Sequence, residues 1–215
     1  MSFKNRMDAG RKLAKALAGY KKQRPVILAL PRGGVLVAAE IAAAFNAPLD
    51  LVLVRKIGVP FQPELAMGAV VDGGSPIIVR NDDVIEIAQI DEATFKAVCE
   101  KELTEIERRR QRYPGNRKRA EINAHIAIVV DDGIATGATI RAALRATRLR
   151  NPTKLVLAVP VAPTRRHTRL LTCVMKPMIS YVLKTMNSST QSVPTMRISA
   201  KFRTRRSWRC LSAFR

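Results

Sequence analysis

The sequence contains little cysteine and no long apolar segment. Its three cysteines, Cys99, Cys173 and Cys210, are far apart, odd in number and form no CxxC pair. This spacing does not favour a disulfide framework or a zinc site, and it fits a protein of the reducing cytoplasm. No run of about 18 apolar residues occurs, so no membrane-spanning helix is predicted. Asp8 and several lysines interrupt the N-terminus, which therefore does not resemble a secretory signal peptide.

Acidic residues are absent from the last quarter of the chain. The sequence has 38 Lys and Arg against 17 Asp and Glu, a formal net charge of +21. Residues 164–215 contain 12 of the basic residues and none of the acids, and so carry more than half of the net charge. Such a charge is typical of nucleic-acid binding proteins. Its uneven distribution indicates a separate origin for the tail, and we do not expect nucleic acid as a partner.

Short runs of Val, Ile and Leu alternate with helical segments along the chain. Strands that are continuously apolar are buried on both faces, which favours a parallel sheet. The predicted fold is α/β with three layers, a mostly parallel central sheet with helices on both faces. A hairpin and helices at about residues 58–120 form a predicted insertion. Buried strands are predicted at Pro25–Leu30, Asp50–Val54, Ile126–Val130 and Leu155–Val159, and helices at 6–18, 35–45 and 139–150.

One predicted strand ends in two adjacent carboxylates. Ile126–Val130 is followed by Asp131 and Asp132, and then by a Gly- and Thr-containing loop, Gly133–Thr139. Open α/β sheets place their ligands at the carboxyl ends of the strands. The glycines allow a close backbone approach to an anion, and the helix that follows directs its N-terminal amides to the same place. A phosphate would therefore suit the loop, and the hydroxyls of a sugar would suit the paired acids.

A second glycine-containing turn follows the first predicted strand. Arg32 supplies a guanidinium group there, and Gly33 and Gly34 offer backbone amides ahead of a helix. Taken alone this signal is weak, because an ordinary turn has the same composition. One strand–helix–strand unit later, Arg55 and Lys56 close the second predicted strand and add positive charge. One of these two cations can equally be a solvated strand end.

Together these segments resemble the type I phosphoribosyltransferase family. Apolar residues, two acids, a short linker and Thr-Gly-x-Thr are similar to the motif with which that family binds phosphoribosyl pyrophosphate (PRPP). Leu53–Gly58 and Pro63–Val70 are similar to a bacterial subgroup whose acceptor is unassigned. The resemblance covers residues 1–163 and implies the fold of that family.

The resemblance also implies roles for individual residues. The acids hold the ribose hydroxyls, the loop after them holds the 5′-phosphate, and the turn near Arg32 holds the pyrophosphate. Mg²⁺ is expected mainly through PRPP, without a protein metal site. Gly58–Pro63 corresponds to a loop that closes over the reacting centre. The predicted catalytic residues are Asp132, Lys56 and Arg32. The predicted PRPP-binding residues are Arg32, Gly33, Gly34, Arg55, Lys56, Asp131, Asp132, Gly133, Ala135, Thr136, Gly137, Ala138 and Thr139.

The implied activity is transfer of the 5-phosphoribosyl group from PRPP to a nitrogen acceptor, expected to be a nucleobase, with release of pyrophosphate. A non-catalytic PRPP- or nucleotide-binding regulatory module is the alternative, because a fold does not fix a function. A cationic nucleic-acid binder is a third hypothesis and rests on net charge alone. His125 and His167 lack metal-ligand spacing and are predicted to be structural or surface residues. The acceptor stays open between purine, pyrimidine and another amine, and a homodimer is the default assembly.

The sequence pattern changes after residue 163. The family would add another helix and strand there, whereas residues 164–215 are rich in Ser, Thr, Arg and Met without clear periodicity. The codons permitted by Met175–Phe202 allow, in a shifted frame, an acid-rich reading with a strand-like segment, similar to the usual end of the subgroup. We therefore predict a phosphoribosyltransferase-like domain, residues 1–163, and a poorly ordered basic tail, residues 164–215. A frameshift is predicted between about Pro163 and Met175.

Overall fold

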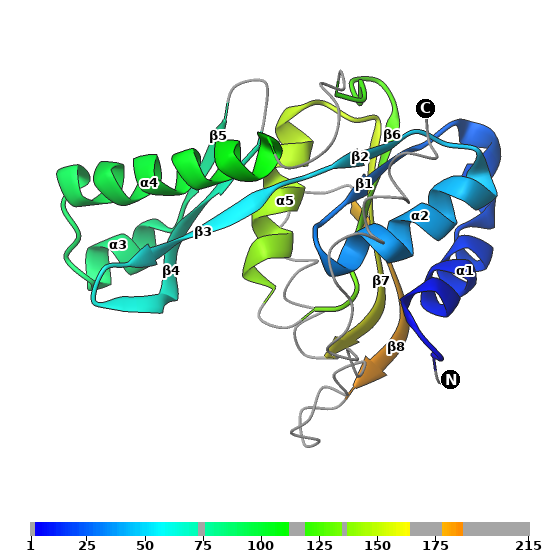
Figure 1. Ribbon diagram of the computed structural model, residues 1–215, viewed down its shortest axis with the longest axis horizontal. Coiled ribbons are helices and arrows are strands. Elements are labelled where there is room, and N and C mark those ends of the chain that lie inside the picture. Colours follow the sequence, from blue (N-terminus) through cyan, green and yellow to red (C-terminus); the bar gives the residue numbers. More distant parts are fainter. Residues whose placement is uncertain (1–2, 73–75, 112–118, 135–136, 164–177, 187–215) are drawn as a thin grey trace.

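The computed structural model describes residues 3–72, 76–111, 119–134, 137–163 and 178–186 (Figure 1). They contain a five-stranded parallel sheet and a separate three-stranded antiparallel sheet. The strand order of the parallel sheet is β2-β1-β6-β7-β8, so the strand that precedes the two acids lies in its centre. These strands are β1 (Val26–Ala29), β2 (Leu49–Leu51), β6 (Ile126–Val130), β7 (Lys154–Pro163) and β8 (Met178–Met186).

Helices cover both faces of the parallel sheet, as Figure 1 shows. Ile27 and Ile128 face one way, into a core shared with α1 (Arg6–Ala16) and α2 (Gly33–Phe45). The short 3-10 helix η1 (Ala18–Gln23) adds Tyr20 to this core. Leu28 and Val129 face the other way, into a core shared with α5 (Ala138–Leu149). Successive strand residues point to opposite faces, and here both faces are buried. This arrangement confirms the predicted three-layer α/β fold.

The chain between the second and third parallel strands forms an insertion with its own core. Its strands pair antiparallel in the order β3-β4-β5, and two helices pack on them. The core of the insertion includes Ile57, Met67, Phe95 and Ile106. No helix in the described part of the chain is both long and apolar enough to cross a membrane. The elements of the insertion are β3 (Val54–Val59), β4 (Gln62–Val71), β5 (Ile77–Arg80), α3 (Asp82–Ile87) and α4 (Glu92–Gln111).

Two local predictions about the start of the insertion were wrong. Arg55 and Lys56 do not close a parallel strand, because β2 ends at Leu51 and both residues lie inside β3, opposite residues of β4. The segment Gly58–Pro63 is not a loop throughout, since only Pro60 and Phe61 separate β3 from β4. The Gly and Pro content suggested a loop. The pairing of β3 with β4 accommodates Gly58 because its register shifts on both sides of that residue, as at a β-bulge.

The parallel sheet continues past the predicted domain boundary at residue 163. That boundary coincides with the end of β7, and β8 then pairs with β7 along its length, from Leu155 opposite Met178 to Pro163 opposite Met186. The nine residues of β8 are therefore part of the sheet and not of a poorly ordered tail. Ile, Tyr, Val and Thr in this segment favour a strand, a local signal that the composition of the whole tail concealed. The remainder of the predicted tail lies outside the described residues.

Candidate functional site

The two glycine-containing turns predicted from the sequence meet at the carboxyl ends of β1 and β6. These strands are neighbours in the sheet, with Ala29 opposite Val130. The Leu30 N–H donates to the Val130 carbonyl oxygen at 2.9 Å, which extends the pairing by one residue. After β1 the chain turns at Arg32 into α2. After β6 it continues into the two acids, Asp131 and Asp132. Sequence segments about 100 residues apart thus form one edge of the sheet.

The glycines of the first turn lie against the acids of the second. A Cβ atom on Gly33 would lie 2.0 Å from Oδ2 of Asp132, and one on Gly34 would lie 2.6 Å from the Val130 carbonyl oxygen and 3.0 Å from Cα of Asp131. A side chain at Gly34 would meet backbone, and one at Gly33 would fit only if the Asp132 side chain moved. The Gly34 N–H donates to the Leu30 carbonyl at 3.1 Å, so this residue provides space and not the exposed amide that was predicted.

Arg32 stands at the start of α2 and is exposed. The Pro31–Arg32 peptide bond that precedes it is cis. Within the described part of the chain Arg32 has no ion-pair or hydrogen-bond partner for its side chain. Its guanidinium group is therefore available to an anion, and its neighbour Gly33 lies against Asp132.

The two acids have different surroundings. Burial and the neighbouring charge of Asp132 raise the pKa of Asp131 to about 8, against the opposing charge of Arg6. Oδ1 of Asp131 accepts the backbone N–H of Asp132 at 2.8 Å. Oδ2 of Asp132 accepts from the Arg6 guanidinium, at 2.8 Å from Nε and 2.6 Å from Nη2. The Asp131 carboxyl therefore tends to keep its proton at neutral pH, whereas Asp132 is the acid that pairs with Arg6.

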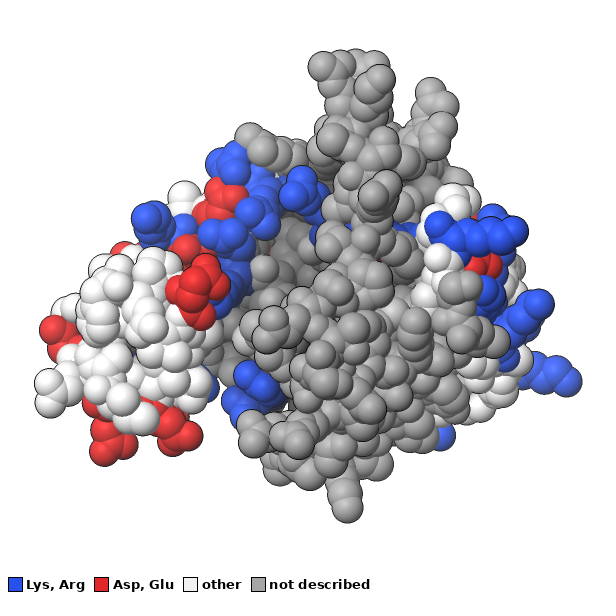
Figure 2. All heavy atoms as spheres, turned by 90° about the horizontal axis from the view of Figure 1, so that it is seen from below, with Lys and Arg blue, Asp and Glu red and all other residues white. Residues whose placement is uncertain are grey.

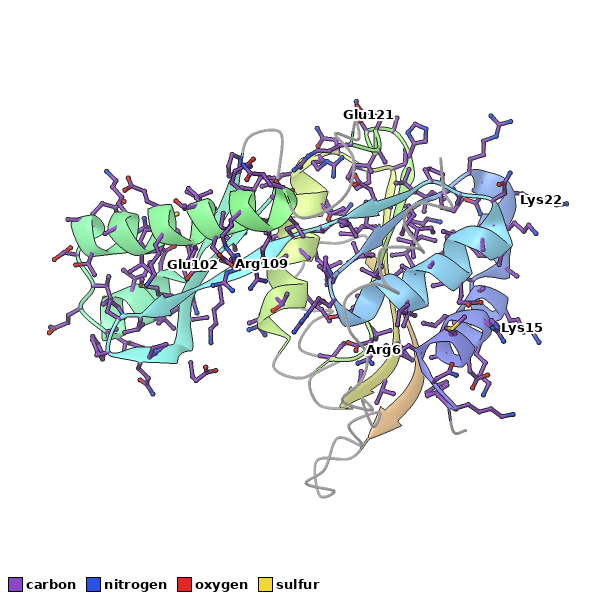
Figure 3. The ribbon with its side chains drawn as sticks, in the orientation of Figure 1. Arg6, Lys15, Lys22, Glu102, Arg109 and Glu121 are labelled. Atoms are coloured by element: carbon purple, nitrogen blue, oxygen red, sulfur yellow. The ribbon has the colours of Figure 1, made fainter. Side chains whose placement is uncertain are left out.

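Arg6 is a site residue that sequence reasoning missed. It lies 126 positions from Asp132 and belongs to the first turn of α1 (Figure 3). The Asn5 side chain caps this helix by accepting the N–H of Asp8 at 2.9 Å, and so fixes where the first turn stands. The sequence showed only a basic residue after a helix cap, and no local pattern connects such a residue with a distant strand end.

The loop after the acids leads into α5. The Ile134 N–H donates to the Val161 carbonyl at 3.0 Å, which holds the first part of the loop against β7. Gly137 stands at the N-cap of α5 with a φ of 79°, a backbone conformation that favours glycine. Ala138 and Thr139 begin the helix, with Thr139 exposed. The remaining predicted loop residues, Ala135 and Thr136, lie outside the described residues.

The structure does not bring Arg55 and Lys56 to the acid pair. Nε of Arg55 lies 2.6 Å from Oε2 of Glu102 on α4, and Nζ of Lys56 lies 3.2 Å from Oε2 of Glu64. Both cations line a pocket of about 470 Å³ between the β3–β4 hairpin and α4, together with Lys101. Figure 3 labels Glu102 at this place. On the face seen in Figure 2, basic side chains gather on one part of the insertion, with acidic side chains among them and at its outer end.

A protein-held metal centre is absent from the described residues, where no group of three or more His, Cys, Asp or Glu side chains could hold an ion. The acid pair nevertheless suits Mg²⁺ that arrives with a phosphate ligand, because such ions use one or two carboxylates and keep several waters. His125 lies exposed ahead of β6, with Nδ1 2.8 Å from the Asn123 carbonyl oxygen. The other histidine, His167, lies outside the described residues.

Comparison with known proteins identifies the family. The model of the phosphoribosyl transferase domain matches residues 3–176. The chain belongs to the phosphoribosyl transferase family. Two Mycobacterium tuberculosis proteins that carry the name phosphoribosyl transferase are 50% identical to it over 161 residues, which is 75% of this chain and 36% of each relative. The chain thus spans little more than a third of the length of these curated relatives.

A solved structure supports the same family fold. The crystal structure of TT1426 from Thermus thermophilus superposes with a TM-score of 0.83 at 32% identity, and the match covers 100% of this chain and 99% of that one. The predicted membership of the type I phosphoribosyltransferases and the predicted fold are therefore confirmed.

Proposed function

We propose that this chain binds PRPP and transfers its 5-phosphoribosyl group to a nitrogen acceptor, with release of pyrophosphate. The contact between Gly33 and Asp132 carries the proposal. It places a turn with an available guanidinium group beside two carboxylates at the ends of neighbouring strands. PRPP carries its pyrophosphate and its two ribose hydroxyls on adjacent carbons, and this juxtaposition matches both groups. Family membership supports the reaction type.

The proposed binding mode assigns each part of PRPP to one part of the site. Asp132, the acid that pairs with Arg6, accepts from one ribose hydroxyl. Asp131 lies beside it and binds the other, as donor when protonated and as acceptor when ionised. Arg32 pairs with the pyrophosphate. The 5′-phosphate lies in the loop that ends at Gly137, ahead of the N-terminal amides of α5.

The proposed reaction breaks the bond between the anomeric carbon and a pyrophosphate oxygen and forms a bond from that carbon to the acceptor nitrogen. The leaving pyrophosphate takes the electron pair, and the acceptor nitrogen loses a proton. We assign Asp132 as the nearest acceptor for that proton. Arg32 stabilises the charge that develops on the pyrophosphate. Mg²⁺, bound with PRPP at the acid pair, would add positive charge to the leaving group.

Of the two cations in the insertion, we assign Lys56 to the leaving pyrophosphate. Its partner Glu64 is 97% exposed, and such surface ion pairs stabilise a protein by less than about 1 kcal/mol. Lys56 can therefore exchange this partner for a phosphate when the β3–β4 hairpin closes over the site. Arg55 is held more firmly, at 2.6 Å from the less exposed Glu102.

Calorimetric titration of PRPP into the chain, with and without Mg²⁺, tests the proposal. We expect saturable binding that weakens at least tenfold in an Asp131→Asn/Asp132→Asn variant, because the ribose hydroxyls lose their charged partner. Unchanged binding by this variant would contradict the site. Pyrophosphate release is then measured with a panel of purines, pyrimidines and other amines. Binding without turnover of any acceptor would favour the regulatory module over the enzyme.

A further inference from the structure

The N-terminal helix reaches the acid pair through a single side chain. Arg6 places two guanidinium nitrogens, Nε and Nη2, on the same oxygen, Oδ2 of Asp132, at 2.8 and 2.6 Å. The side chain of Arg6 is 23% exposed and that of Asp132 is 30% exposed. The pair is thus partly shielded from water, a setting in which charge-assisted hydrogen bonds are stronger than at an open surface.

Asp132 is confined on two sides by this arrangement. Its carboxylate lies over Gly33, so closely that a Cβ there would be 2.3 Å from Cγ and 2.0 Å from Oδ2. Arg6 holds Oδ2 from the other element, α1. The Gly33 backbone and the Arg6 guanidinium group together set the orientation of the Asp132 carboxylate. Arg6 contacts only Oδ2, so it does not occupy Oδ1.

Arg6 also supplies positive charge at the acid pair, since its guanidinium group contacts Asp132. PRPP is a polyanion, and an uncompensated carboxylate would repel it during binding. Arg6 opposes the effect of burial on Asp131, since its charge lowers the pKa of that acid. Its positive charge therefore offsets the negative charge of the acid pair that the ligand meets.

We propose that Arg6 is a positioning residue of the PRPP site, which fixes the Asp132 carboxylate against Gly33 and offsets its charge so that a polyanionic sugar phosphate can bind. The inference rests on the proposed function, since it assigns Arg6 a part in binding the same ligand. It extends that site to α1, an element that contributes none of the predicted residues.

The chain offers a matched control in Arg11. Nε of Arg11 lies 2.9 Å from Oε2 of Glu40 and links α1 to α2, the same two helices that flank the site. Arg11 is more exposed than Arg6, at 63% against 23%, and its ion pair involves neither acid. Arg11→Ala therefore removes an arginine and an ion pair from the same helix without touching Asp132.

The experiment compares the Kd of PRPP with Mg²⁺ by calorimetry for the wild type, Arg6→Ala, Arg6→Lys and Arg11→Ala, with melting temperatures measured in parallel. We expect Arg6→Ala to raise the Kd at least tenfold and Arg11→Ala to change it less than twofold. Arg6→Lys keeps the charge but loses the two-nitrogen contact, and should recover part of the lost affinity. Such recovery distinguishes positioning from general support of the fold.

Each outcome has a defined meaning. Equal Kd values for Arg6→Ala and Arg11→Ala, with binding intact in the wild type, would overturn this inference and leave the proposed function standing. A wild type that binds no PRPP would overturn both. If Arg6→Ala loses its far-ultraviolet circular dichroism, Arg6→Gln, which keeps most of the side-chain volume, takes its place under the same criteria.

Discussion

Gly33 and Gly34 show why individual positions at this site tolerate little change. Gly33 meets the side chain of Asp132, whereas Gly34 meets the backbone of Val130 and Asp131. A side chain can rotate away from a new methyl group, but the backbone of a central strand cannot. The two glycines therefore have different consequences when they are replaced.

We expect Gly34→Ala to destabilise the fold by about 1–3 kcal/mol, because the new Cβ would push the start of α2 away from the end of β6. Gly33→Ala should instead leave stability nearly unchanged and weaken PRPP binding by displacing the Asp132 carboxylate. Gly19→Ala is the control, since its Cβ would meet nothing within 4 Å. Chemical denaturation and PRPP titration measure the two effects, and equal unfolding free energies for Gly34→Ala and Gly19→Ala would contradict the steric argument.

Asp131 predicts a pH dependence of stability. Burial raises its pKa from 3.8 to about 8, so between these values the unfolded chain is ionised at this residue and the folded chain is protonated. The unfolded state then binds fewer protons, and the contribution of Asp131 to stability falls as the pH rises from about 4 to about 8.

Asp131→Asn removes this penalty. We expect the variant to match the wild type near pH 4 and to be more stable near pH 8, by at least about 1 kcal/mol, while losing PRPP affinity. Unfolding measured by denaturant at several pH values checks this. A variant less stable than the wild type at pH 8 would show that the carboxyl group is not disfavoured by burial.

At the scale of elements, the insertion has a core of its own around Phe95, and its strands also join the core of the parallel sheet through Ala69 and Val71. Phe95 on α4 packs among Ile57 and Met67 of the insertion strands, and the Arg80 guanidinium lies 4.1 Å from the centre of its ring. Regions with their own core often open as independent cooperative units. The part of the hairpin that carries Lys56 and packs in the insertion core can then move relative to the acid pair.

Phe95→Ala should destabilise the insertion by about 3–5 kcal/mol through loss of a buried ring. Hydrogen exchange should accelerate in β3, β4 and α4 and stay slow in β1 and β6. Ile87→Ala, at an 81% exposed position of α3 in the same insertion, is the control and should change neither. Equal acceleration in all strands would show that the two cores unfold together.

Lys56→Ala and Arg55→Ala test which cation of the insertion serves the pyrophosphate. We expect Lys56→Ala to slow pyrophosphate release about tenfold or more at saturating PRPP, with unchanged stability, because its ion pair is exposed. Arg55→Ala should mainly lower stability, since it leaves the less exposed Glu102 without its partner. The reverse pattern in turnover and melting temperature would exchange the two assignments.

At the scale of the whole molecule, the end of the chain separates into a strand and a basic segment. β8 closes one edge of the parallel sheet through its pairing with β7. Residues 187–215 contain seven Lys and Arg and no acid. The strand contributes to the fold, whereas the net charge of the chain depends heavily on residues beyond it.

Deleting residues 187–215 should therefore preserve PRPP binding and sharply lower the salt concentration at which the protein leaves a heparin column. Deleting residues 178–215 should additionally expose the edge of β7 and promote aggregation. If the chain that lacks residues 187–215 still bound DNA, the basic tail would not be the source of nucleic-acid binding by this chain of net charge +21.

The predicted frameshift stays a prediction and has a direct test. The strand-like part of the shifted reading falls on the residues of β8, so either frame suits an edge strand at this place. Sequencing the gene between the codons of Pro163 and Met175 should reveal a base whose removal or addition restores the acid-rich reading. An unbroken frame across this interval would end the hypothesis.

The sequence by itself determined the strand that ends in Asp131 and Asp132, the turn at Arg32, and the layered α/β fold. These features are local, because continuous apolar runs and glycine-containing turns reflect the conformation of adjacent residues. Tertiary structure decided what lies beside the acids. The pairing of β1 with β6 brought Gly33 against Asp132, α1 delivered Arg6 from 126 positions away, and the antiparallel pairing of β3 carried Arg55 and Lys56 to a different sheet. Such contacts depend on which elements become neighbours, and no local sequence pattern specifies that.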